Sequence, residues 1–189
     1  MKILTASLAL VLALATQSAT RAGSNDLPGQ LQAGDHRLVL NGEGVRTKTL
    51  LQLYVAGLYL PRPNNNPVEI ISADEPMAIR IKITSGFVSQ DALVSSLEEG
   101  FQKAMNGQTA GLQPRISQFR DCLTDPISKD DTIDLVYVPQ RGVIVNKNGK
   151  FKGLVAGVDF KQALFGIWLS ENPADNRLKQ AMLTSKTAR

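Results

Sequence analysis

Arg46 is the residue of this sequence whose type and position best suit the binding of an anion. It lies in segment 41–48, close to Gly42 and Gly44, and leads into an apolar run that ends at Leu60. The planar guanidinium presents five N–H donors in a fixed fork, which suits a carboxylate or an enolate oxygen. Such an Arg can anchor an anion at the mouth of an apolar cleft. The alternative is an Arg at a strand end that reaches solvent.

Residue types that commonly carry catalysis or bind metals are scarce elsewhere. His36 and Cys122 are the only histidine and cysteine, which excludes a typical zinc site and leaves a Ser-His-Asp triad dependent on His36. The acidic segment 125–131 lacks the ligand spacing of a calcium loop, and segment 42–44 lacks the third glycine of a dinucleotide-binding motif. We therefore expect no cofactor and no metal. Cys122 stands at helical spacing from Phe119, which indicates a buried structural thiol.

The N-terminus has the layout of a secretory signal peptide. A basic start is followed by an uncharged apolar run over 3–15 and then by small and polar residues. Cleavage could follow Ala19 or Ala22. We therefore divide the chain into a signal peptide, residues 1–22, and one domain, residues 23–189, and expect a periplasmic or secreted protein. The alternative is an apolar anchor that stays attached.

Composition, charge and the length of apolar runs give no sign of a nucleic-acid partner or of a membrane span in the predicted mature chain. Of the 189 residues 43% are hydrophobic and 20% charged, as in an ordinary globular domain. Removal of residues 1–22 takes away two cations and no acid, so the net charge falls from +4 to +2. Because no cluster of Lys and Arg interleaves with aromatic residues, nucleic acid is not an expected partner. After Ala22 no apolar run reaches 18 residues, so we expect no membrane span.

The hydrophobic pattern predicts an α+β fold, with helices on one side of an antiparallel sheet. Residues 23–36 are polar and Gly-rich and predict a loose lead-in. We expect strands over 37–40, 47–60, 78–84, 132–138, 142–145 and 151–155, the first ended by Asn41-Gly42 and the second with a bulge or close approach at Gly57. Helices are expected to start at Ser89, Pro114, Asp159 and segment 172–175, the last running to Leu183.

Several segments resemble the chalcone isomerase-like family. Segment 42–60 resembles the opening of that fold, with its Gly-rich turn, Val45-Arg46 and a strand ending Gly-Leu-Tyr-Leu. Segment 149–183 resembles the family's hairpin and last helix pair, and 165–175 is typical of its bacterial branch. The resemblance begins near residue 35 and implies an open-faced β-sandwich, an antiparallel sheet backed by helices with a cleft between them.

The same resemblance implies that the catalytic set of the family's enzymes is incomplete here. Their Arg is matched by Arg46, whereas their strand Thr falls at about Tyr54, their first-helix Tyr at about Ala92 and the following Asn at about Glu99. The helix Ser or Thr expected near Gly166 is also absent. One Arg can hold an anion, but it cannot supply the full set of donors that ring closure needs.

We therefore expect an exported, non-catalytic protein that binds a small amphipathic anion such as a fatty acid. Arg46 would be the anchor and Tyr54 or Tyr59 a hydroxyl donor, although fatty-acid-binding relatives also use a first-helix Tyr that this chain lacks. One alternative is an isomerase with a rebuilt site, in which a desolvated Glu99 acts as base. Another is an interaction module with a filled cleft, in which Arg46 pairs with an acid and three apolar residues pack solidly: Leu50, Leu53 and Phe101. The ligand's identity and the oligomeric state stay open.

Overall fold

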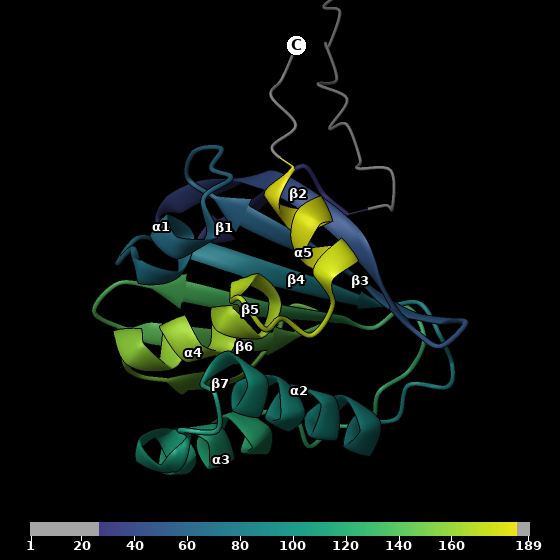
Figure 1. Ribbon diagram of the computed structural model, residues 1–189. Helices are drawn as coiled ribbons and strands as arrows, with labels where there is room; N and C mark the ends of the chain where they lie inside the picture. The colour runs from purple at the N-terminus through teal and green to yellow at the C-terminus, as the bar shows by residue number, and fades with distance from the viewer. Residues whose placement is uncertain (1–26, 185–189) are drawn as a thin grey trace, which may run out of the picture.

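Seven antiparallel strands form one sheet in which each strand pairs with its neighbours in sequence (Figure 1). The computed structural model describes residues 27–184, and the predicted signal peptide lies outside the described residues. The strands are β1 (Gln30–Ala33), β2 (His36–Lys48), β3 (Leu51–Leu60), β4 (Met77–Ile83), β5 (Thr132–Val138), β6 (Gly142–Lys147) and β7 (Lys150–Val155). All pairings are antiparallel, as the sequence predicts.

The helices lie together on one face of this sheet, which confirms the expected α+β, open-faced architecture (Figure 1). They are α1 (Pro67–Ser72), α2 (Gln90–Ala104), α3 (Gln113–Asp121), α4 (Val158–Leu169) and α5 (Asn176–Leu183), with a 3₁₀ turn, η1 (Ala110–Leu112), before α3. The main core fills the space between helices and sheet, and Trp168 of α4 is among its fully buried side chains. In the described part of the chain no helix is both long and apolar enough to cross a membrane.

Side-chain caps explain where three of the helices begin. The Ser89 hydroxyl accepts from the Ala92 N–H and starts α2, as predicted. Asp175 accepts from two backbone N–H groups and starts α5, so this helix begins after Asp175 and not at Asn172. Asn66 caps α1 with Pro67 in its first turn. α1 was not predicted from the sequence, although this Asn-Pro pair is the signal for its start.

β2 is longer than the strand predicted over 37–40, and β3 is shorter than the strand predicted over 47–60. The prediction of a strand over 37–40 ended by Asn41-Gly42 is wrong, because β2 continues through these residues to Lys48 and the chain turns at Thr49, whose φ is +58°. Asn41 does not act as a turn residue, since its buried side chain bonds to the Asn64 backbone and to the Met182 carbonyl of α5. The prediction of a loose 23–36 is also wrong, because it contains β1.

The glycines of segment 41–48 let α5 lie directly on β2. A Cβ at Gly42 would stand 2.3 Å from the Ala181 carbonyl oxygen, and one at Gly44 would stand 2.7 Å from the Ala181 Cβ. Glycine is therefore required here for close packing of strand and helix and not for flexibility. Gly57 is a close-approach point as predicted, because a Cβ there would meet the Leu27 side chain at 2.7 Å.

Candidate functional site

A cleft of about 240 Å³ opens between the free end of the β2–β3 hairpin and the first half of α2. Its walls come from the hairpin, from the loop before α2 and from one stripe of α2, and are formed by Lys48, Leu53, Tyr54, Phe87, Val88, Ala92, Leu93, Ser95, Ser96 and Glu99. Ala92, Ser95, Ser96 and Glu99 follow helical spacing, so they face the hairpin together. Because three of these four side chains are small, α2 does not fill the space beside the strand.

Tyr54 lies at the inner wall of this cleft, directly across the β2–β3 ladder from Arg46. Opposed residues of an antiparallel pair share a face of the sheet, so both side chains lie on the helix side. The Tyr54 hydroxyl accepts a hydrogen bond from the Trp168 indole N–H at 3.2 Å. Burial raises the pKa of Tyr54, although the bond from Trp168 and the charge of Arg46 act in the opposite direction. Tyr54 therefore stays protonated and can donate its hydroxyl proton.

Arg46 is mostly buried and pairs with Asp175, the residue that caps α5. Its Nη1 lies 3.1 Å from Asp175 Oδ2, and the other carboxylate oxygen accepts from the N–H groups of Arg177 and Leu178. Burial would raise the pKa of Asp175, but the Leu178 N–H, Arg46 and the Arg177 N–H together hold it below its usual range. The contact to Asp175 is through one nitrogen, so it does not use the full guanidinium fork.

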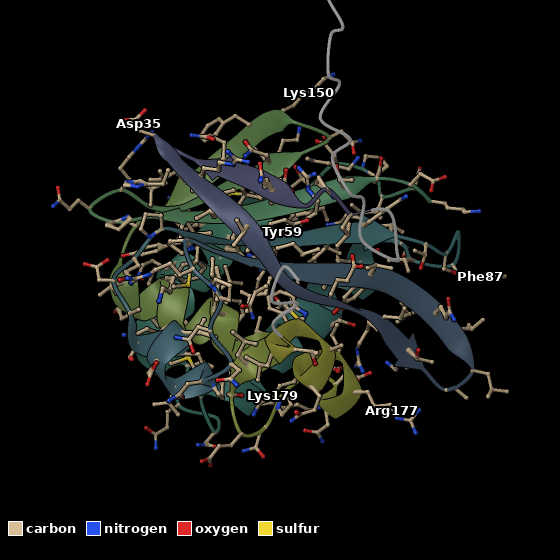
Figure 2. All side chains as sticks on the ribbon, turned by 90° about the horizontal axis from the view of Figure 1, so that it is seen from above. Asp35, Tyr59, Phe87, Lys150, Arg177 and Lys179 are labelled. Carbon is tan, nitrogen blue, oxygen red and sulfur yellow. The ribbon has the colours of Figure 1, made fainter. Side chains whose placement is uncertain are left out.

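Tyr59 lies on the opposite face of the sheet from Arg46 and Tyr54. Its hydroxyl donates to the Pro28 carbonyl at 2.8 Å, and its ring is fully buried in a second, small cluster with Leu38 and Ala78. Figure 2 shows Tyr59 within the strands, above the layer of helices. Of the three residues that the sequence singled out, the fold brings Arg46 and Tyr54 together and sets Tyr59 apart.

The rebuilt-isomerase and filled-cleft hypotheses agree with the structure at some residues and disagree with it at others. Glu99 lines the cleft but is exposed, so it lacks the desolvation that a rebuilt isomerase base would require. Phe101 is buried and Arg46 does pair with an acid, as a filled-cleft module would have it. Leu53, however, is only partly buried, and Leu50 is 92% exposed.

Lys161 is a buried cation that the sequence analysis missed. Its side chain is 0% exposed, and Nζ donates to the carbonyls of Ile70, Ile71 and Ala73 at the end of α1, at 3.3, 2.8 and 2.5 Å. Burial lowers its pKa to about 8. The available signal was a Lys beside Phe160, in a helix whose later residues, 163–169, are all apolar or Gly. Because three carbonyls surround the ammonium, we assign it to fastening α1 onto α4.

Three larger hollows are lined by neither Arg46 nor Tyr54. One of about 390 Å³ lies beside loop 61–64, one of about 410 Å³ lies among α1 and the ends of α2 and α4, and another of about 390 Å³ lies between the end of α2 and segment 171–176. The 240 Å³ cleft remains the candidate site because only it, of these four, is lined by Tyr54. Among the described residues no group of acidic, His and Cys side chains could hold a metal ion. Cys122 is buried as predicted, and burial raises its pKa.

Comparison with known proteins places this geometry in a family. The model of a family described as chalcone isomerase-like matches residues 19–184. Comparison with curated proteins gives no match. Among solved structures, the crystal structure of an Arabidopsis thaliana fatty-acid binding protein is similar, with a TM-score of 0.66 and 20% sequence identity over 85% of this chain and 93% of that chain. At this identity the likeness establishes the fold.

Proposed function

Because the chain belongs to the chalcone isomerase-like family, we propose that it is a non-catalytic binding protein for a small amphipathic anion such as a fatty acid. We further propose that it acts in the periplasm or after secretion, on the strength of the N-terminal sequence pattern. The similar Arabidopsis protein is named for fatty-acid binding, which supports the class of ligand.

The cleft between β3 and α2 is the observation that carries this proposal. Leu53, Val88 and Leu93 supply apolar wall, and Tyr54, whose hydroxyl is bonded by Trp168, lines the inner wall. A pocket for a small molecule is typically about 300 to 1,000 Å³. A cleft of about 240 Å³ lies just below that range, so it suits a short acyl chain or one whose end stays outside.

Charge supports an anionic head group. Lys48 and the exposed Glu99 both line the cleft, and Arg46 is the direct cross-strand partner of Tyr54, which lines it too. A carboxylate near Tyr54 could accept from its hydroxyl and from the part of the Arg46 guanidinium that Asp175 does not contact. The single-nitrogen contact with Asp175 leaves this geometry open.

Native mass spectrometry of the protein purified from its own host tests the proposal. We expect an adduct of fatty-acid mass on the wild type, and its loss in Arg46→Ala, because the anionic anchor is removed. Arg177→Ala is the matched control, since Arg177 is an exposed arginine next to the same α5 cap and should keep the adduct. Clean apo mass for every variant, even after addition of fatty acids, would exclude the binding function.

A protein-interaction module is the second candidate, favoured by the Arg46–Asp175 pair. If that pair only fastens α5 to β2, Arg46→Ala would lower stability without changing any bound ligand. Comparison of the thermal midpoint with the adduct in the same variant separates the two candidates.

A further inference from the structure

Three bulky apolar side chains stand in solvent around the mouth of the cleft. Leu50 is 92% exposed, Leu51 49% and Phe87 80%. Leu50 and Leu51 form the tip of the β2–β3 hairpin, and Phe87 comes from the loop between β4 and α2. Figure 2 shows Phe87 at the same end of the molecule as the hairpin tip, pointing away from the protein. Large apolar side chains gathered in solvent mark a site of contact with a protein or a membrane.

These side chains belong to one surface together with the cleft. Lys48 is the cross-strand partner of Leu51, and it lines the cleft with Phe87 and Leu53. The contact surface and the opening of the cleft are therefore continuous. A partner that covers this surface also covers the mouth of the cleft. If that partner is the apolar interior of a membrane, it is in direct contact with the proposed binding site.

The charges of this surface suit anionic head groups. Segments 45–53 and 84–90 contain Arg46 and Lys48 as their charged residues and no carboxylate. The acids nearest in sequence are Glu43, which is buried in β2, and Asp91 in the first turn of α2, and the exposed Glu99 of α2 lines the cleft. Exposed apolar side chains beside cations are the combination that holds a protein at the surface of an anionic bilayer.

We propose that the β2–β3 hairpin tip and the loop before α2 dock on an anionic phospholipid bilayer, and that an acyl ligand enters the cleft from it. Leu50, Leu51 and Phe87 enter the acyl region, while Lys48 stays among the head groups, as long cationic side chains do at interfaces. This inference rests on the proposed function, because it supplies the route by which the ligand reaches the cleft.

Vesicle flotation tests the docking surface. The predicted mature chain, from Gly23 onward, is used because it contains every described strand and helix and lacks the apolar run over 3–15, which would itself bind lipid. With vesicles of phosphatidylcholine and phosphatidylglycerol, we expect Leu50→Ser/Leu51→Ser to bind at least about tenfold more weakly than wild type. The control Val68→Ser/Phe151→Ser removes two side chains that are also exposed, 72% and 65%, but lie elsewhere, and should stay within twofold of wild type.

Binding of decanoate without vesicles separates this inference from the proposed function. Leu50 and Leu51 do not line the cleft, so their double variant should keep the wild-type affinity within about twofold. Wild type that binds decanoate but no vesicle overturns the docking surface and leaves the proposed function standing. Wild type that binds vesicles but no decanoate contradicts the proposed function and with it the entry route.

Sedimentation velocity distinguishes the bilayer from a second copy of this chain. We expect wild type and the Leu50→Ser/Leu51→Ser variant to sediment alike. If wild type self-associates, the variant does not, and neither floats with vesicles, the surface is an interface between copies and the proposal is overturned.

Discussion

The β2–β3 hairpin meets helices in two different ways at its two ends. Near Gly42 and Gly44, α5 lies in direct contact with the strand backbone, and Asn41 bonds to the last turn of that helix. At the other end Leu53 and Tyr54 face α2 across a cleft of about 240 Å³. The same pair of strands therefore has a filled end, which α5 covers, and an open end, which faces the cleft.

The difference arises from side-chain size on each side of the contact. Where the strand has glycine, the helix approaches until backbone meets backbone. Where the strand has large residues and the helix presents Ala92 and two serines, neither side fills the gap. Close packing makes the filled end important for stability, whereas the open end is available for a ligand.

Gly42→Ala should have the largest effect, because it disrupts the filled end. The new Cβ would meet backbone atoms of α5 at 2.3 to 2.8 Å, and backbone cannot rotate away as a side chain can. We expect a loss of about 3 kcal/mol in the free energy of unfolding, measured by urea denaturation. Gly86→Ala is the control, since nothing lies within 4 Å of its Cβ position. Equal stability of the two variants would show that α5 is not held against β2.

Lys161, which joins α4 to α1, should give the stability of the protein a pH dependence of its own. Its pKa is about 8 in the folded protein, against 10.5 for an ordinary lysine, so the unfolded chain binds more protons between these values. Stability should therefore rise with pH across this window, and this contribution is lost as the pH falls through about 8. We expect a gain of about 2 kcal/mol between pH 7 and 9.5 in wild type relative to Lys161→Met. Parallel pH profiles for the two proteins would contradict it.

Asp175→Ala should have a smaller effect, of about 1 kcal/mol, because it removes the cap of α5 and the partner of Arg46. The pKa of Asp175 is held low in the folded state, so its contribution is present at neutral pH and is lost as the pH falls through that lowered pKa. The gap between wild type and variant should shrink from pH 7 to 3 in thermal melts. Asp91→Ala, at an exposed acid in the first turn of α2, is the control and should change little at either pH.

Ala92→Leu should have the smallest effect on stability and a large one on binding. Ala92 is an exposed residue of α2 that lines the cleft, so a larger side chain occupies ligand space without straining the core. We expect a change within about 0.5 kcal/mol in unfolding free energy and at least a tenfold loss of fatty-acid affinity, measured by titration calorimetry. Ala110→Leu places the same side chain at an exposed site away from the cleft and should keep the affinity. Unchanged affinity in Ala92→Leu would move the ligand to another hollow.

Local patterns were sufficient to predict most elements of the fold. Alternation in 78–84 predicted β4, Ser89 predicted the start of α2, and Pro114 correctly marked the first turn of α3. Local patterns misled at Asn41-Gly42, where a typical turn pair lies inside a strand. The Asn41 side chain is held inside the strand by hydrogen bonds to the carbonyls of Asn64 and Met182. Both residues are distant in sequence, so a local pattern does not reveal these contacts.

The sequence by itself determined the fold class, because hydrophobic period is a local property, and it singled out Arg46, Tyr54 and Tyr59 by side-chain chemistry and by resemblance to the family. Only the tertiary structure decided that Tyr54 faces the cleft while Tyr59 faces away, that Asp175 contacts Arg46, and that Lys161 is buried among carbonyls. The physical reason is that strand register and helix packing set which face of the sheet each side chain meets. A shift of one residue in register exchanges the two faces, and composition alone does not reveal it.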